Sequence, residues 1–139
     1  MLRRVLIAAP LMLLAQAAVA ADDKAAAEGG QYVDLLPLGL PIVVNGRLVN
    51  YVFVHVRINL AASADPLRAR AKEPHLRDAL VRAAHRTPFT VATDHNKIDT
   101  AKLAAALMRD AATILGRGQV RSVAVTSQQP RRRVATPRA

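Results

Sequence analysis

The stretch from Val49 to Leu60 alternates between two kinds of side chain. Valine, isoleucine or leucine stands at every second position from Val52 onward, and the positions between them, from Tyr51 to Asn59, carry aromatic or polar side chains. A period of two over this length indicates a β-strand, because successive side chains of a strand point to opposite faces of the sheet. The strand therefore has one aliphatic face that needs a cover and a second face that can meet water or a partner.

The residues before this strand predict a second strand joined to it by a tight turn. Asn45-Gly46 is the best hairpin signal in the chain, because a type I′ turn needs a positive φ at both central residues. We expect it to join Leu40–Val44 to Arg47–Leu60 as an antiparallel pair. Two prolines interrupt the short apolar runs between Gln31 and Val44, and proline cannot donate a backbone hydrogen bond. This part is therefore expected to be an edge strand or an extended arm.

A first helix is predicted at residues 73–86. Pro74 lies in its first turn, where the missing N–H is no loss, and apolar residues recur at helical spacing behind it. Asp78 and Arg82 stand four residues apart, so we expect them to pair on the exposed side of the helix.

A second, alanine-rich helix is predicted at residues 100–115. Asp99 is its expected N-cap, and Gly116 suits the position just after its end. Residues 119–127 then predict a last strand that pairs with the long one. Together these elements predict an α+β fold, in which a small antiparallel sheet has two helices packed on one face.

The segments between these elements are expected to be less regular. Residues 61–72 are interpreted as a connector that contains Asp65-Pro66. Residues 89–92 are expected to form a short extended piece, and the polar residues 94–99 are expected to form a loop.

The first twenty residues, Met1–Ala20, have the pattern of a secretory signal peptide. Arg3-Arg4 precedes the apolar run Val5–Leu14, and Ala18-Val19-Ala20 provides a small-x-small cleavage pattern. The apolar run is short for a membrane span, which takes about 20 residues. We therefore expect a cleaved signal and export, most simply to a bacterial periplasm. The alternative is an uncleaved anchor that associates the chain with the inner membrane.

Two further segments flank the expected domain, which spans residues 31–129. Residues 21–30 are small and polar and end in Gly-Gly, which is typical of a flexible linker. Residues 130–139 carry four arginines and little to bury, which predicts a disordered basic tail. The formal net charge is +10, and the signal segment and the tail hold two and four of the arginines, so about +4 remains elsewhere. That modest excess says little about fold.

Composition excludes several classes of site. The chain has no cysteine, so disulfides, zinc–thiolate sites and thiol catalysis are ruled out. The two histidines of the first expected helix, His75 and His85, lie ten residues apart and cannot share a metal. No nucleophile elbow, phosphate-binding loop or dinucleotide fingerprint occurs. We therefore expect no enzyme activity, no metal, no cofactor and, for an exported chain with few aromatics, no nucleic-acid partner.

The order of these motifs resembles the periplasmic domain of the flagellar basal-body-associated FliL family. Four pieces carry the resemblance: the opening Y-V-D-L-L-P-L, the strand Y-V-F-V-H-V-R-I-N-L, the helix start E-P-H-L-R-D-A-L, and the end I-L-G-R-G-Q-V-R-S-V-A-V-T-S-Q-Q-P. They cover roughly residues 31–129, and the helix start is the most specific of them.

This resemblance implies a stomatin-like fold, in which a small antiparallel sheet carries helices on one side, and it implies no enzyme activity. Members of the family look like ring-forming accessories around the flagellar stator that touch its peptidoglycan-binding subunit. The chain departs from the family at its front, because the family usually keeps an N-terminal transmembrane anchor and this segment has a cleavage pattern. We expect an exported protein of the flagellar basal body that serves motility by contact with stator subunits and with copies of itself in a ring. The alternative is an exported module that binds another envelope protein or an anionic envelope polymer.

The contact surface is expected on the parts of the fold that do not cover the sheet. An apolar arm broken by Pro37 can lie across a neighbouring copy and close a ring head to tail. The alternative is that the arm folds back on its own sheet. The outer side of the first helix is the other expected part. The residues predicted to make protein contacts are Tyr32, Val33, Leu35, Leu36, His75, Arg77, Asp78 and Arg82.

Overall fold

The computed structural model describes residues 30–135, where the chain forms an antiparallel sheet and three helices, so the predicted α+β class is confirmed. The expected signal peptide, the expected linker up to residue 29 and residues 136–139 lie outside the described residues. The elements in chain order are β1 (Tyr32–Asp34), β2 (Leu38–Val44), β3 (Arg47–Leu60), α2 (Pro66–Ala71), α3 (Glu73–Arg86), β4 (Thr90–Val91), β5 (Asp94–Ile98), α4 (Thr100–Ile114) and β6 (Val120–Pro130).

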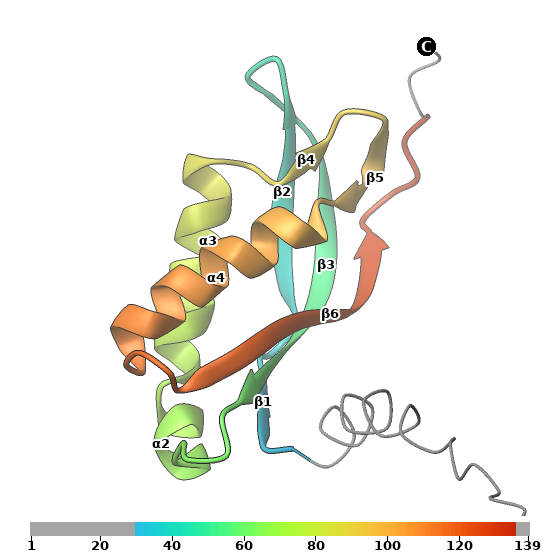
Figure 1. Ribbon diagram of the computed structural model, residues 1–139. Coiled ribbons are helices and arrows are strands. Elements are labelled where there is room, and N and C mark those ends of the chain that lie inside the picture. The colour runs from blue at the N-terminus through green and yellow to red at the C-terminus, as the bar shows by residue number, and fades with distance from the viewer. Residues whose placement is uncertain (1–29, 136–139) are drawn as a thin grey trace, which may run out of the picture.

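The long strand β3 runs through the middle of the main sheet and pairs antiparallel with three other strands. β1 pairs with residues 57–59 of β3 and β2 pairs with residues 47–54, so these two strands follow one another along one edge. β6 pairs along the other edge with residues 52–60 of β3, as the sequence predicts. Figure 1 shows α3 and α4 on one side of this sheet.

The predicted hairpin between β2 and β3 is confirmed. Asn45 and Gly46 both have a positive φ, 51° and 73°, which is the conformation that a type I′ turn requires. The pairing runs from Val44 opposite Arg47 to Leu38 opposite Val54, with a register shift between Ile42 and Val43. β2 begins at Leu38 and is therefore longer than the expected strand Leu40–Val44.

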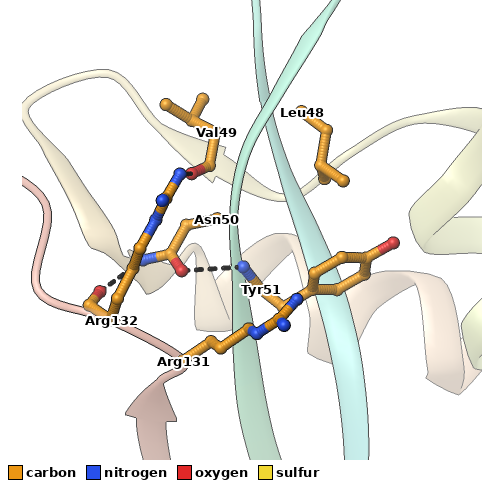
Figure 2. Close-up of a pocket in the computed structure, with 6 residues that line it drawn as sticks. All are labelled: Leu48, Val49, Asn50, Tyr51, Arg131 and Arg132. Carbon is orange, nitrogen blue, oxygen red and sulfur yellow. Dashed lines mark hydrogen bonds between the residues drawn. The ribbon is translucent and has the colours of Figure 1, made fainter.

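The C-terminal part of the chain is docked, so the prediction of a disordered tail from residue 130 is wrong for residues 130–135. Residues 131–134, the C-terminal strap, follow β6 and lie against β3 and β5. The N–H of Arg131 donates to the carbonyl of Tyr51 (2.7 Å), and the Asn50 Nδ2 donates to the carbonyl of Arg132 (2.8 Å; Figure 2). Val134 exchanges two hydrogen bonds with the amide of Asn96, at 2.7 and 2.8 Å. Hydrogen bonds to polar groups hold this segment in place. The absence of apolar residues therefore does not make it disordered.

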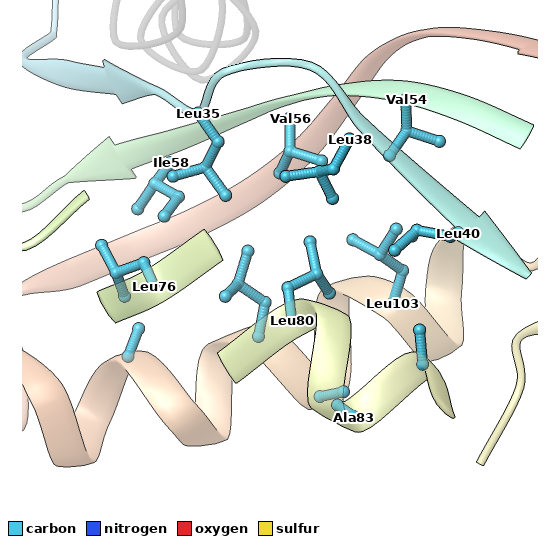
Figure 3. Packing of buried hydrophobic residues seen from close by; sticks show 14 of the residues in the cluster. Leu35, Leu38, Leu40, Val54, Val56, Ile58, Leu76, Leu80, Ala83 and Leu103 are labelled. Atoms are coloured by element: carbon cyan, nitrogen blue, oxygen red, sulfur yellow. The ribbon is translucent and has the colours of Figure 1, made fainter. Parts of the chain in front are cut away.

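The hydrophobic core lies between one face of the sheet and the two long helices. The inward row of β3 from Val52 to Leu60 is at most 2% exposed at every apolar position. α3 contributes Leu76 and Leu80, and α4 contributes Leu103 and Leu107; all four leucines are 0% exposed. Figure 3 shows side chains of the strands and of the helices pointing toward one another across this interface.

Both predicted helices are confirmed, together with the signals at the ends of α4. α3 has the bounds that the sequence predicts, and α4 ends at Ile114, with Leu115 as its C-cap. The Asp99 side chain accepts a hydrogen bond from the N–H of Lys102 (3.1 Å) and so caps the first turn of α4. Gly116 follows with a φ of 107°, a conformation that L side chains rarely adopt.

A third helix, α2, occupies the segment that we interpret from the sequence as a connector. The Asp65 side chain accepts hydrogen bonds from the N–H groups of Leu67 and Arg68, and Pro66 stands at the first helical position. Ala69 is the buried residue of this helix, so very little apolar surface anchors it. The cap and the proline thus form a helix that apolar periodicity does not reveal.

The expected polar loop at residues 94–99 is instead strand β5, paired with β4. Its Ile98 and His95 are buried, at 3% and 8% exposure, whereas the other three residues are polar and less covered. The N–H of Ile98 donates to the Gln128 side chain (2.9 Å), and the N–H of Asp99 donates to the carbonyl of Phe89 (2.8 Å). β5 has no alternating apolar pattern of its own. Hydrogen bonds to other segments of the chain therefore hold it in place.

Within residues 30–135, none of the helices has the length and apolar character that crossing a membrane requires.

Candidate protein-contact surface

The face of β3 that points away from the helices carries a row of large and polar side chains, which we call the open sheet face. Its members are Tyr51, Phe53, His55, Arg57 and Asn59. The row lies in the middle of the sheet, and its neighbours on β6 are short beside Arg57 and Asn59, where Ala124 and Ser122 stand opposite, but long beside Phe53, where Gln129 stands opposite. The row therefore presents aromatic, cationic and amide groups side by side on one face of the sheet.

Phe53 is the most apolar member of the open sheet face and is 47% exposed. It stands opposite Gly39 on β2, and a Cβ on that glycine would lie 3.2 Å from the Phe53 Cε1. The ring therefore lies over the glycine backbone, where a side chain would crowd it. This contact positions the ring and still leaves nearly half of its surface open to a partner.

Arg57 ties β1 to the open sheet face. Its Nε and one terminal nitrogen donate to the two carboxylate oxygens of Asp34, at 2.8 and 3.0 Å. Its guanidinium also lies 3.8 Å from the centre of the Tyr32 ring, within the range of a cation–π contact. The hydrogen bonds from Arg57 lower the pKa of Asp34, and those to Asp34 raise the pKa of Arg57. The result is an ordered aromatic and cationic group at one end of the row.

At the other end of the row, a shallow pocket of about 330 Å³ opens beside Tyr51. Its lining combines residues of β3 and of the C-terminal strap: Leu48, Val49, Asn50, Tyr51, Arg131 and Arg132. Figure 2 shows Leu48 and Tyr51 on one side of the strand and Asn50 with Arg132 on the other. Arg132 donates to the carbonyl of Val49 (3.2 Å), so its guanidinium helps to hold the strap. The pocket extends the open sheet face toward the hairpin and adds apolar surface at Leu48, which is 53% exposed.

The arm that the sequence suggests as a bridge to a neighbouring copy folds back on its own sheet, which is the alternative considered above. β1 pairs with β3, and the N–H of Leu35 donates to the carbonyl of Val56 (2.9 Å). Val33 and Leu35 are each 3% exposed, so the prediction that these two residues make contacts with another protein is wrong for this structure. Tyr32 and Leu36 remain available, at 43% and 58% exposure.

The predicted contact residues of the first helix lie on the outer side of α3, in the helical layer. His75, Asp78 and Arg82 are exposed, and Arg77 is half-buried. The predicted pair is present, with the Arg82 guanidinium 2.9 Å from the Asp78 carboxylate. These residues are on the opposite layer from the open sheet face. The arm and the start of α3 are linked by a hydrogen bond from the N–H of Leu36 to the Glu73 carboxylate (3.0 Å).

Sequence reasoning identified the second face of the long strand as a possible partner surface but named no contact residue on it. The alternation itself was the available signal, because an exposed Phe53 beside His55 and Arg57 is unusual for a face that only meets water. The position of Asp34 and Tyr32 around Arg57 was not predictable, because it depends on the register of β1 against β3.

Across the part of the chain that the structure describes, no three His, Asp or Glu side chains gather closely enough to hold a metal ion. Neither a family model nor a curated protein matches the chain. Function therefore has to be inferred from the residues and their geometry.

Proposed function

We propose that this chain acts without catalysis, as a contact protein whose working surface is the open sheet face. The observation that carries this proposal is the exposed Phe53 ring, fixed over Gly39 in a row with Tyr51, His55 and Arg57. Aromatic residues and arginine are the side chains most enriched where proteins bind one another. A rigid aromatic residue also loses little conformational entropy on binding.

The shape of the surface favours a protein partner over a small molecule. Small ligands bind in concave sites that enclose most of their surface. The pocket beside Tyr51 is shallow and is continuous with the flat row along β3. A macromolecule can cover the row and the pocket together, whereas a small molecule on this face stays largely in water.

The resemblance to the FliL family supports a more specific form of the proposal. In this form the chain is an exported, stomatin-like protein of the flagellar basal body, and its partner is a stator subunit on the periplasmic side. The arm pairs within its own chain, so a ring of copies would need a surface other than Val33 and Leu35. The open sheet face is the surface that we propose for contact with the stator subunit.

Capture from a membrane extract of a flagellated bacterium tests this function. The full chain is immobilised as wild type, as Phe53→Ser and as Leu36→Ser, and captured stator subunits are quantified. Leu36 is a matched control, because it is also a large exposed apolar residue but lies beyond the end of β1. We expect Phe53→Ser to lose at least about tenfold in capture, as truncation of an interface hot spot does.

Leu36→Ser is expected to retain capture close to wild type. The opposite pattern would show that the arm, and not the open sheet face, makes the contact. Absence of stator subunits from the wild-type capture would contradict the flagellar form of the proposal.

A further inference from the structure

The short helix α2 presents an exposed apolar residue at one end of the molecule. Leu67 is 74% exposed, more than the four other exposed large apolar residues of the described chain. Figure 1 shows α2, the start of β1 and the turn between α4 and β6 at this end, with the β2–β3 hairpin at the opposite end. Nothing in the packing of the domain explains why a leucine stands there.

The neighbours of Leu67 on the helix are arranged as on an interfacial helix. At about 100° per residue, Ala71 lies close to the direction of Leu67, whereas Arg70 and Arg68 lie on either side of it. Ala69 points the opposite way and is buried. The outer face of α2 is thus an apolar centre with an arginine on each flank. Such a face suits a helix that lies in the plane of a membrane surface.

The two flanking arginines extend along the end of the molecule in opposite directions. Arg70 lines a hollow that it shares with Tyr32 and Leu36 of the arm. Arg68 lies beside Leu115 and Gln119, at the turn that leads into β6. This turn carries a further exposed cation, Arg117. Lys72, directly after α2, is a fourth cation and is half-buried.

The acids at this end are occupied by the backbone and do not pair with these cations. Asp65 accepts hydrogen bonds from the N–H groups at the start of α2, and Glu73 accepts one from the N–H of Leu36. Ion pairs join Arg57 with Asp34 and Arg82 with Asp78, and neither pair includes a cation of α2. The carboxylates of Asp65 and Glu73 keep their negative charge, so the four cations Arg68, Arg70, Lys72 and Arg117 leave an excess of two positive charges in the patch around Leu67.

The geometry points to an anionic lipid bilayer as the partner of this patch. We propose that the outer face of α2 rests on the bilayer, with Leu67 at the boundary between head groups and acyl chains and with Arg68, Arg70 and Arg117 against lipid phosphates. Basic residues beside an apolar side chain are the combination that anionic membrane surfaces attract.

The position of the first described residues also favours a lipid bilayer as the partner of α2. The described residues begin at Gly30, and the carbonyl of Gln31 accepts a hydrogen bond from the N–H of Leu60 (2.8 Å), close to the start of α2. The apolar run Val5–Leu14 precedes Gly30 by fifteen residues of sequence. Membrane attachment through that run would keep the domain within reach of the bilayer, because fifteen residues span at most about 50 Å. The patch provides a second contact, which also operates when the run is removed.

The absence of cysteine permits a direct test in the full chain. A single Leu67→Cys residue is labelled with a polarity-sensitive fluorophore, and a single Leu48→Cys residue at the hairpin end serves as the matched control. Each labelled chain is mixed with vesicles of phosphatidylcholine alone and of phosphatidylcholine with phosphatidylglycerol. We expect a blue shift at position 67 with the anionic vesicles, a much smaller one with the zwitterionic vesicles, and none at position 48.

Charge dependence provides the second measurement. Arg68→Gln with Arg70→Gln should weaken the partition onto anionic vesicles about tenfold or more, since each basic residue near such a surface contributes to the attraction. The pair Arg77→Gln with Arg82→Gln on α3 removes the same charge elsewhere and should have a much smaller effect. Raised salt should act like the first pair, because it screens exposed charges.

Several results would overturn the proposal. Equal shifts with both kinds of vesicle would show tethering by the N-terminal run alone. Equal shifts at positions 67 and 48 would show adsorption without a preferred face. A shift with soluble polyphosphate but none with anionic vesicles would assign the patch to a dissolved polyanion.

Discussion

The two faces of β3 are built from neighbouring residues and differ almost completely in their surroundings. The inward residue Val54 is 0% exposed, and the outward residue Phe53, next to it in the chain, is 47% exposed. The apolar residues of the inward row from Val52 to Leu60 belong to the same buried cluster as the core leucines of α3 and α4. The outward row is not covered by another layer of the described structure (Figure 1).

The difference shows that the two faces are held in place by different forces. Inward residues are fixed by burial, which contributes roughly 25 cal/mol per Å² of apolar surface. Outward residues are fixed by lateral contacts, the ring of Phe53 by Gly39 and the guanidinium of Arg57 by Asp34 and Tyr32. A change on the inward face should therefore alter stability, and a change on the outward face should alter recognition.

The largest expected effect is on the inward side. Leu107→Ala removes a fully buried side chain that α4 directs into the core, and should lower the free energy of unfolding by about 2–5 kcal/mol. Leu67→Ala is the matched control, because it deletes the same atoms from an exposed position and should cost about 0.5 kcal/mol or less. Denaturant titrations of both variants provide the comparison. Similar losses would mean that α4 is not packed as described.

The C-terminal strap should have the next largest effect, because it satisfies the polar member of the inward row. Asn50 is 4% exposed, and its amide donates to the carbonyls of Arg132 and His95. Deletion of residues 131–139 removes one of these acceptors and should cost about 1–3 kcal/mol, the range for a buried polar group left without its partner. Deletion of residues 136–139 alone is the control and should leave the thermal midpoint nearly unchanged. Equal midpoints for both truncations would show that the strap does not stabilise the fold.

The smallest effect should come from the ion pair between Asp34 and Arg57. Because hydrogen bonds from Arg57 lower the pKa of Asp34, the folded chain binds this proton less readily than the unfolded chain. The stabilisation is therefore complete above the ordinary carboxyl pKa of about 4, and it is lost as the pH falls through the lowered folded value. Both side chains are partly exposed, which keeps the effect small.

A pH series of thermal midpoints for wild type and Asp34→Asn measures this contribution. The wild type should be slightly more stable near neutral pH, and the difference between the two should shrink in strong acid. A difference that does not change with pH would show that the ion pair does not stabilise the attachment of β1.

The sequence predicted the parts of the fold that are governed by local periodicity. Alternation gave β3, the Asn45-Gly46 turn gave its pairing with β2, and helical spacing gave α3 and α4. In each of these segments the local pattern and the tertiary packing act in the same direction, because the apolar residues that recur are also the ones that become buried.

The sequence did not predict the parts that depend on polar contacts between distant residues. β5 and the C-terminal strap hold one another through Asn96 and Val134, which lie 38 residues apart in the chain. Neither segment has an apolar pattern of its own. α2 is a different case, because Asp65-Pro66 is a local helix start that our interpretation of residues 61–72 as a connector did not use.

The candidate site was only partly predictable for the same reason. Sequence reasoning placed Tyr32 to Leu36 in an arm without deciding where the arm lies. The pairing of β1 with β3 buries Val33 and brings Asp34 to Arg57. β1 has only three residues, and so short a strand does not determine from its own sequence which residues of β3 it pairs with.

The most direct test of the account compares Phe53→Ser with Val54→Ser. The free energy of unfolding is measured for both variants by denaturant titration under the same conditions. We predict that Val54→Ser loses about 2–5 kcal/mol, because it leaves a void and buries a hydroxyl. Phe53→Ser should lose about 1 kcal/mol or less, the range of strand preference at an open position. Equal losses, or a greater loss for Phe53→Ser, would contradict the division of β3 into a face that makes the fold and a face that is free for contact.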